Sequence, residues 1–248
     1  MMAAIFPVLV LNGRPAAGKS EIIDSLRRQP DEERRGRFHI GRLHEIDDFP
    51  ILWNWFEEDD ILEKKWGRPR LHTTPDGYFF HHDFWNLLIE RLGLEYAKLV
   101  RDIPDLDATH TVLVEFSRGS EHGGYRAAYS YLSDAILQQA AILYIDVSYE
   151  ESLRKNRCRF NPNKPDSILE HGLSDAKLKG LYKEVDWEQL TADDPELIPV
   201  RGMRVPYAVF PNHDDVTTSL GSVFEERLES TLRTLWERWA RLHSVSAH

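Results

Sequence analysis

The 248-residue chain has one cysteine, few glycines and prolines, and no long apolar run. The single cysteine, Cys158, excludes an internal disulfide, so we expect a reducing cytoplasm. Fourteen glycines and 13 prolines exclude collagen-like and low-complexity chains. No apolar stretch approaches the roughly 18 residues of a membrane span, and residues 1–11 lack the basic segment and cleavage site of a signal peptide. The sequence therefore predicts a globular protein without a membrane partner.

Positive charge is also scarce. The 31 Lys and Arg residues stand against 41 Asp and Glu, which gives a formal net charge of −10. Because an acidic protein is repelled by nucleic-acid phosphates, we expect no duplex nucleic acid partner. The basic run Arg34–Arg37 favours a solvated turn over an anion site. With 42% apolar and 11% aromatic residues, the chain can build a sizeable core, and we expect a single domain over residues 1–248.

Short apolar runs alternate with helical patterns along the chain. Strands are expected at 5–11, 38–46, 111–116, 140–147 and 205–210, and helices at 19–28, 83–98, 125–139, 148–159, 167–190 and 222–242. This alternation predicts an α/β protein with a three-layer α/β/α fold around a five-stranded parallel sheet. Ligands of such sheets bind beyond the carboxyl ends of the strands. We expect the last helix to close one face of the core, and a homodimer seam along it is the alternative.

The strongest motif follows the first predicted strand. The pattern G-x-x-x-x-G-K-[ST] is met by Gly13, Arg14, Pro15, Ala16, Ala17, Gly18, Lys19 and Ser20. Its two glycines let the backbone curl around a phosphate, and the next helix directs the positive end of its dipole at the same anion. Lys19 is expected to reach the β- and γ-phosphates, and the Ser20 hydroxyl to bind Mg²⁺. The sequence therefore predicts a site for ATP and Mg²⁺.

Acidic side chains end the second and third predicted strands. A kinase needs a carboxylate within hydrogen-bond reach of the acceptor hydroxyl. Asp47 and Asp48 are adjacent, so only one should face the site, and we choose Asp47 as the base; helix capping is the alternative. Glu115 is expected to bind Mg²⁺ or its waters, and pairing with Arg118 is the alternative.

Two arginines follow the fourth predicted strand. Arg154 and Arg157 are three residues apart, so a helix places them on one face. They could clamp the transferring phosphoryl group, or form a solvated face paired with Glu150 and Glu151. The Asn-Pro-Asn-Lys-Pro stretch at 161–165 predicts the hinge of a helical lid at about 154–190.

An aromatic segment separates the second and third predicted strands. It predicts an acceptor-binding insert at about 50–105, although most of its aromatic residues are expected to be ordinary core. The side chains that we expect to contact an acceptor are Tyr78, His81, His82 and Asp83.

Together these motifs resemble those of the P-loop small-molecule kinases, particularly the uridine kinase, nicotinamide riboside kinase and pantothenate kinase group. The matching residues are the loop at 13–20, Asp47-Asp48-Phe49, Glu115, and the strand end at 145–147 with Arg154 and Arg157. The start, Leu-Asn-Gly-x-x-x-Ala-Gly-Lys-Ser, is similar to chloramphenicol phosphotransferase. Val209-Phe210-Pro211-Asn212 is similar to the last strand of several such kinases.

The resemblance implies a P-loop NTPase fold and transfer of the ATP γ-phosphoryl group to a hydroxyl of a small molecule, such as a nucleoside or a related metabolite. It implies that Asp47 is the base, that Glu115 belongs to the Mg²⁺ shell, that both arginines belong to the lid, and that Asn212 lies near the adenine. The alternatives are a regulatory or assembly protein that binds nucleotide without kinase activity, and a toxin-type kinase of a nucleotide sugar.

Overall fold

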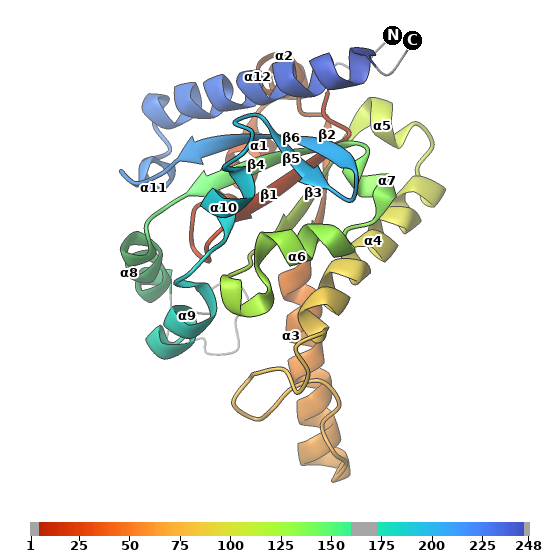
Figure 1. Cartoon of the computed structure of the whole chain (residues 1–248), viewed down its shortest axis with the longest axis vertical. Helices are drawn as coiled ribbons and strands as arrows, with labels where there is room; N and C mark the ends of the chain where they lie inside the picture. Colours follow the sequence, from red (N-terminus) through yellow and green to blue (C-terminus); the bar gives the residue numbers. More distant parts are fainter. Residues whose placement is uncertain (1–4, 160–172, 246–248) are drawn as a thin grey trace.

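One six-stranded sheet forms the centre of the computed structural model, which describes residues 5–159 and 173–245 (Figure 1). The strand order is β2-β3-β1-β4-β6-β5. The pairs β2/β3, β3/β1, β1/β4 and β4/β6 are parallel, and β5/β6 is antiparallel. The strands are β1 (Val8–Gly13), β2 (Arg42–Asp47), β3 (His110–Phe116), β4 (Ala140–Asp146), β5 (Leu197–Val200) and β6 (Met203–Pro211).

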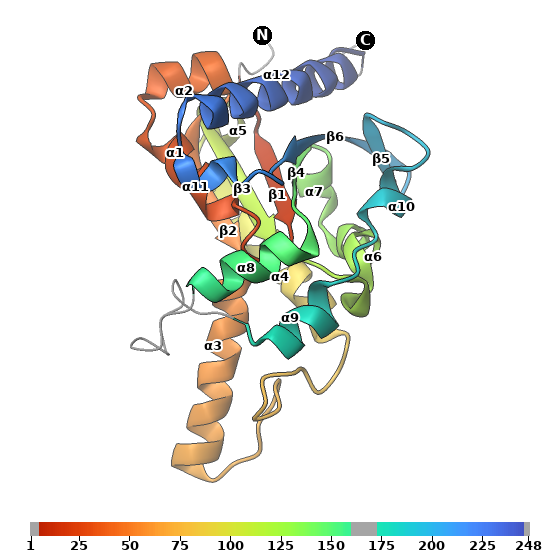
Figure 2. The same cartoon turned by 90° about the vertical axis from the view of Figure 1, so that its left-hand side faces the viewer.

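Helices cover both faces of the sheet (Figures 1 and 2). Their bounds are α1 (Lys19–Arg28), α2 (Asp31–Phe38), α3 (Asp48–Asp60), the π-helix η1 (Ile61–Lys65), α4 (Phe84–Asp102), α5 (Leu106–Thr109), the 3₁₀-helix η2 (Ser120–His122), α6 (Gly124–Tyr131), α7 (Asp134–Leu137), α8 (Tyr149–Arg159), α9 (Asp175–Tyr182), α10 (Trp187–Thr191), α11 (Val216–Ser219) and α12 (Ser222–Val245).

Alternation along the strands divides the core into two layers, because successive side chains point to opposite faces. In β1, Val8 and Val10 pack with α4, α6, α7 and α10, whereas Leu9 and Leu11 pack with α1, α2 and α12. All four side chains are at most 1% exposed. A strand that is buried on both faces consists of consecutive apolar residues, so the apolar run at 5–11 correctly predicted β1.

The sheet differs from the prediction by one strand. All five predicted strands are present as parallel neighbours, but the sheet is mixed, since β5 adds an antiparallel edge to β6. The two residues between them, Arg201 and Gly202, have φ values of 46° and 82°. Positive φ at both central residues is typical of a tight hairpin turn. The prediction of five strands is therefore wrong, and the missed strand is only four residues long.

Several predicted helices also differ. The basic run predicted as a turn lies in α2, where Arg34 is buried and donates to the Gly41 carbonyl oxygen at 2.9 Å. The helix expected at 125–139 is divided into α6 and α7, and the one expected at 167–190 contains α9 and α10. The predicted hinge at 161–165 lies outside the described residues.

The predicted insert begins with α3, which projects away from the sheet (Figures 1 and 2). The chain then returns through a coil with an isolated bridge between Thr73 and Phe79, and continues into α4. The buried carboxylate of Asp59 accepts hydrogen bonds from the backbone nitrogens of Leu71 and Thr73 at 2.7 and 2.6 Å, so it holds this coil against α3.

The last helix, α12, has its apolar side inside the molecule. Its five fully or nearly fully buried side chains belong to the core on one face of the sheet, as the sequence predicts: Phe224, Leu228, Leu232, Leu235 and Trp239. This apolar stripe is therefore not available for the alternative homodimer seam. None of the helices in the described part of the chain has the length and hydropathy that a bilayer span requires.

Candidate functional site

The glycine-rich loop connects β1 to α1 at the carboxyl edge of the sheet. Gly18 has φ 110° and caps the amino end of α1. A Cβ at Gly18 would lie 2.7 Å from the Thr217 hydroxyl oxygen, so only glycine fits there. Ala16 also has positive φ, 56°. The loop therefore folds back on itself, and the first-turn N–H groups of α1, which lack partners within a helix, lie at its mouth.

Lys19 lies at the base of this loop. Its Nζ donates to the Ser117 hydroxyl at 2.8 Å and to the Arg14 carbonyl oxygen at 3.3 Å, and it lies 3.8 Å from Glu115 Oε1. Only 6% of the residue is exposed. Since β3 is the neighbour of β1, the sheet register places Glu115 opposite Leu11, next to the loop. The lysine is thus held between the loop and the end of β3.

Asp47 and Glu115 form an acidic pair at the ends of β2 and β3. They are register partners in the parallel ladder, so their side chains leave the sheet on the same side. Burial and the neighbouring charges of Glu115 and Asp48 raise the pKa of Asp47 to about 8. Burial, partly offset by the Lys19 charge, raises the pKa of Glu115. The pair therefore retains a proton near neutral pH, and it titrates as a unit.

Asp48 forms a buried ion pair with Arg118 and does not join the acidic pair of Asp47 and Glu115. Arg118 Nη1 donates to Asp48 Oδ2 at 2.5 Å and to the Ser117 carbonyl oxygen at 2.7 Å. The Arg118 guanidinium also lies over the rings of Trp85 and Phe116, at 5.3 and 5.6 Å from their centroids. The sequence analysis gave Arg118 as an alternative partner of Glu115; in the structure Arg118 pairs with Asp48. Asp47 meanwhile also caps α3, accepting from the Phe49 backbone nitrogen at 3.0 Å.

A divalent cation fits the donors at this edge. Ser20 is exposed at the mouth of the loop, and the half-buried Glu115 carboxylate lies 3.8 Å from Lys19 Nζ. Hydroxyl and carboxylate oxygens are hard ligands of the type that Mg²⁺ prefers. The described residues contain no cluster of three or more His, Cys, Asp or Glu side chains that could hold a metal. Two protein ligands completed by phosphate and water oxygens match the way Mg²⁺ usually binds.

Aromatic hydroxyls and one asparagine support the loop from behind. Tyr125 Oη accepts from the Gly13 backbone nitrogen at 3.1 Å and donates to the Gly13 carbonyl oxygen at 3.0 Å. Asn212 is fully buried, and its Nδ2 donates to the Ala17 carbonyl oxygen and the Thr217 hydroxyl, both at 2.8 Å. Asn212 is not one of the described residues that line the cleft. Asn212 therefore braces the loop, and its expected place near the adenine stays a prediction.

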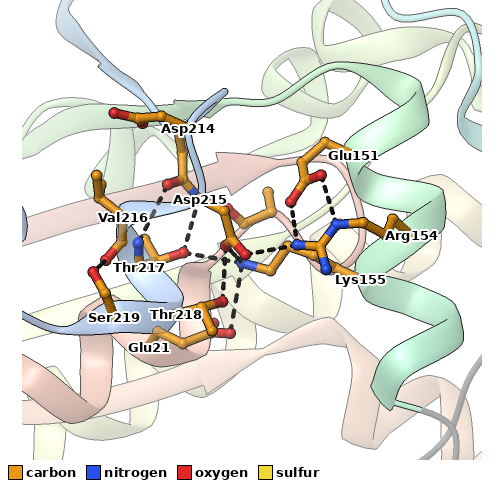
Figure 3. A network of polar contacts seen from close by, with 12 residues as sticks. Glu21, Glu151, Arg154, Lys155, Asp214, Asp215, Val216, Thr217, Thr218 and Ser219 are labelled. Carbon is orange, nitrogen blue, oxygen red and sulfur yellow. Dashed lines mark hydrogen bonds and ion pairs between the residues drawn. The ribbon is translucent and has the colours of Figure 1, made fainter.

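The two predicted lid arginines do not share one role. Arg154 lines the cleft, and its Nη2 donates to Glu151 Oε1 and Asp215 Oδ2, both at 2.6 Å (Figure 3). Arg157 donates to Asp175 at 2.5 Å and is not among the described residues of the cleft lining. The structure thus brings Arg154 but not Arg157 to the cleft lining, and the expectation that both clamp a phosphoryl group stays a prediction. The helix turns their side chains to different neighbours, because α9 offers an acid to one of them only.

Lys155 was missed by the sequence reasoning, although it lies between the two arginines. It is 8% exposed, and its Nζ donates to Asp215 Oδ1 at 2.9 Å and Thr217 Oγ1 at 3.0 Å (Figure 3). It also lies 3.8 Å from Glu21 Oε1 of α1. This network ties α8 to the start of α1 and to α11. No sequence pattern indicates it, since its acids come from two distant segments.

A large cleft runs from the loop to the insert. Its volume is about 1830 Å³, and Lys19, Asp47 and Glu115 line it together with residues of α3 and the coil after η1. Of the four acceptor candidates, Tyr78 and His82 line the cleft, and His81 and Asp83 are not among the described lining residues. The aromatic residues of the lining are Phe49, Trp53, Phe56, Tyr78, Phe79, Trp85, Phe116 and Tyr182.

Comparison with known proteins shows no family for this chain. No protein-family model matches the chain, and no curated protein matches it. Among solved structures, TT1252 from Thermus thermophilus is 15% identical with a TM-score of 0.42, and the match covers 96% of this chain and 98% of that one. APE1195 is 16% identical with a TM-score of 0.38, covering 94% and 97%. Similarity at this level carries no argument about fold or activity.

Proposed function

We propose that the protein is a P-loop kinase that transfers the γ-phosphoryl group of ATP to a hydroxyl of a small molecule, such as a nucleoside or a related metabolite. The observation that carries this proposal is the meeting of Lys19, Asp47 and Glu115 in one cleft beside the glycine-rich loop. Phosphoryl transfer needs positioning and charge stabilisation more than covalent help from the protein. Each of these three side chains supplies one part of that requirement.

The loop is assigned the triphosphate. Its backbone amides and the amino end of α1 favour an anion, and Lys19 brings a positive charge to the β- and γ-phosphates. Ser20 and Glu115 would hold Mg²⁺, which when bound neutralises charge on the phosphate oxygens. A bound cation there would also relieve the repulsion between the Asp47 and Glu115 carboxylates.

Asp47 is assigned the acceptor hydroxyl. A general base works best when its pKa lies near the working pH, and the pKa of Asp47 is raised to about 8. As the hydroxyl oxygen attacks the γ-phosphorus, the bond from that phosphorus to the β,γ-bridging oxygen would break, ADP would leave, and the hydroxyl proton would pass to the Asp47 carboxylate. Arg118 holds Asp48 aside, so one carboxylate of the adjacent pair is left for this role.

Arg154 is assigned to charge stabilisation at the phosphates, because it lines the cleft. Its present acceptors, Glu151 and Asp215, hold the guanidinium at the cleft edge. A bound phosphate would compete with these carboxylates for the same donors. We assign no such role to Arg157.

The cleft volume favours a kinase over the main alternative, a protein that only binds nucleotide. A regulatory or assembly protein that only binds nucleotide needs the loop and the Mg²⁺ ligands, but no space beside Asp47. Sites for one small ligand usually measure about 300–1,000 Å³. The volume here, about 1830 Å³, leaves room for a second ligand and supports a kinase. A toxin-type kinase of nucleotide sugars shares these features and is separated from the first proposal by its acceptor.

The proposal is tested by screening hydroxyl compounds, nucleosides and nucleotide sugars for an ATP-dependent gain of one phosphoryl mass. Lys19→Ala should abolish the gain, and Asp47→Asn should lower kcat with the affinity for ATP and Mg²⁺ nearly unchanged. Lys98→Ala, a lysine of the same cleft that pairs with Glu95 instead of the loop, is the matched control and should retain activity. Nucleotide binding without any mass gain would favour the regulatory alternative.

A further inference from the structure

Arg14, inside the glycine-rich loop, is not among the described residues that line the cleft, and its side chain reaches a different element. Its Nη1 donates to the Val147 carbonyl oxygen at 2.8 Å. Its Nε and Nη2 donate to the carbonyl oxygens of Tyr182 and Lys183, at 3.3 and 3.2 Å. The last two carbonyls lie at the carboxyl end of α9, where a helix has unpaired acceptors and carries partial negative charge. The guanidinium therefore connects the phosphate-binding loop to the end of α9.

The carboxyl end of α9 is also held against the segment after β3. The Ser120 backbone nitrogen donates to the Glu184 carbonyl oxygen at 2.8 Å. Gly119 lies so close to α9 that a Cβ there would be 1.9 Å from the Leu181 carbonyl oxygen. Two neighbouring strand ends, those of β1 and β3, thus fix the same end of one helix. Of these two connections, the hydrogen bonds of Arg14 are the ones that join the end of α9 to the glycine-rich loop.

The other half of α9 contacts the insert. Lys177 Nζ donates to the Asp76 carbonyl oxygen and lies 4.9 Å from the centroid of the Tyr78 ring. Burial lowers the pKa of Lys177, as expected for an ammonium group covered by the coil. Tyr78 and Lys177 both line the cleft on the side of the proposed acceptor. Lys177 and Tyr182 are five residues apart, so about 7 Å of helix separates the two connections.

We propose that α9 couples the nucleotide site to the acceptor site, with Arg14 and Lys177 as the positioning residues at its two ends. The proposal rests on the function proposed above. A nucleotide that orders the loop also restricts Arg14, then α9, and through Lys177 the segment 73–79. An acceptor that meets an ordered segment loses less entropy on binding, so the two ligands bind with positive coupling. We expect a coupling of about tenfold in affinity, which is within the usual range.

Hydrogen exchange on the full chain tests this coupling, with mass spectrometry resolving the peptides over 13–20, 73–79 and 175–182. The probe is ADP with Mg²⁺. In the wild type, the nucleotide should slow exchange at the loop and, at least severalfold, at 73–79. In Lys177→Met the loop should still be protected by the nucleotide, but 73–79 should not.

The Arg14 variants test the other end. Without nucleotide, Arg14→Ala should speed exchange severalfold at both 175–182 and 73–79, and Arg14→Lys should restore part of the protection. Arg35→Ala is the matched control, because Arg35 also donates to a carbonyl oxygen, that of Thr109 at 2.8 Å, but lies in α2, which packs with α1 and α12. It should leave exchange at 73–79 unchanged.

The outcomes separate the two proposals. Protection of the loop by ADP without protection of 73–79 overturns the coupling and leaves the nucleotide site standing. Absence of protection at the loop contradicts the proposed function. In that case the comparison of Arg14→Ala with wild type, made without nucleotide, still decides whether α9 connects the loop to the insert: unchanged exchange at 73–79 refutes it.

Discussion

Replacing Asp47 with asparagine should stabilise the fold, and the gain should grow with pH. The pKa of Asp47 rises from 3.8 to about 8 on folding, chiefly because of burial and then of Glu115. The unfolded chain loses this proton near pH 4 and the folded protein near pH 8. Between these values the folded protein holds more protons, so the free energy of unfolding of the wild type falls as pH rises.

The magnitude follows from the proton affinity. A tenfold difference corresponds to about 1.4 kcal/mol, so the full shift sets an upper limit of about 6 kcal/mol for the cost of ionising Asp47. Asp47 lies at the wall of an open cleft and shares its proton with Glu115, so solvent screening reduces the cost; we expect about 2 kcal/mol. Asparagine has no charge but can still accept the Phe49 hydrogen bond that caps α3.

Urea unfolding at pH 5, 6, 7 and 8 measures this effect for the wild type and Asp47→Asn. The variant should be close to the wild type at pH 5 and more stable by about 2 kcal/mol at pH 8. Asp102→Asn is the control, since Arg101 lowers the pKa of this exposed carboxyl and no gain with pH is expected. Added Mg²⁺ should stabilise the wild type more than Asp47→Asn. A difference between the two proteins that does not change with pH would refute the reasoning.

Two further variants test the supports of the cleft. Asn212→Ala removes the hydrogen bond to the buried Ala17 carbonyl oxygen and one of the two donors to the Thr217 hydroxyl, the other being Lys155. The free energy of unfolding should therefore fall by about 1–3 kcal/mol, and calorimetry should show weaker binding of ATP and Mg²⁺. Asp59→Asn should speed hydrogen exchange at 71–73 at pH 7. Burial would raise the pKa of Asp59, but hydrogen bonds from Leu71 and Thr73 lower it overall. The wild type therefore loses this stabilisation only as pH falls below about 4, where the exchange rates of the two proteins should converge.

Local sequence signals predicted the elements that have a local physical cause. The apolar run of β1, the glycine of the loop and the start of α1 at Lys19 were all predicted, because burial on both faces and positive φ leave a mark in the sequence itself. The four-residue strand β5 was missed because a run that short has no periodicity. Its signal was the Arg201-Gly202 turn, which is typical of hairpins.

The candidate site divides in the same way. The sequence predicted the types of side chain that follow the strands, and that parallel strands bring Asp47 and Glu115 to one edge. It could not predict which acid Arg118 binds, that Asn212 turns to Ala17, or that Arg157 turns to Asp175. Each of these contacts joins segments far apart in the chain, and their geometry depends on how the helices pack.

What the sequence determined by itself is the five parallel strands and the loop that follows the first of them, since both follow from patterns within a few consecutive residues. What only the tertiary structure decided is the surroundings of the loop: the raised pKa of Asp47, the buried Asp48–Arg118 pair, and the contacts of α9 with both the loop and the insert. Electrostatic energies depend on burial and on the distance between charges, and neither quantity is defined until distant segments have packed together.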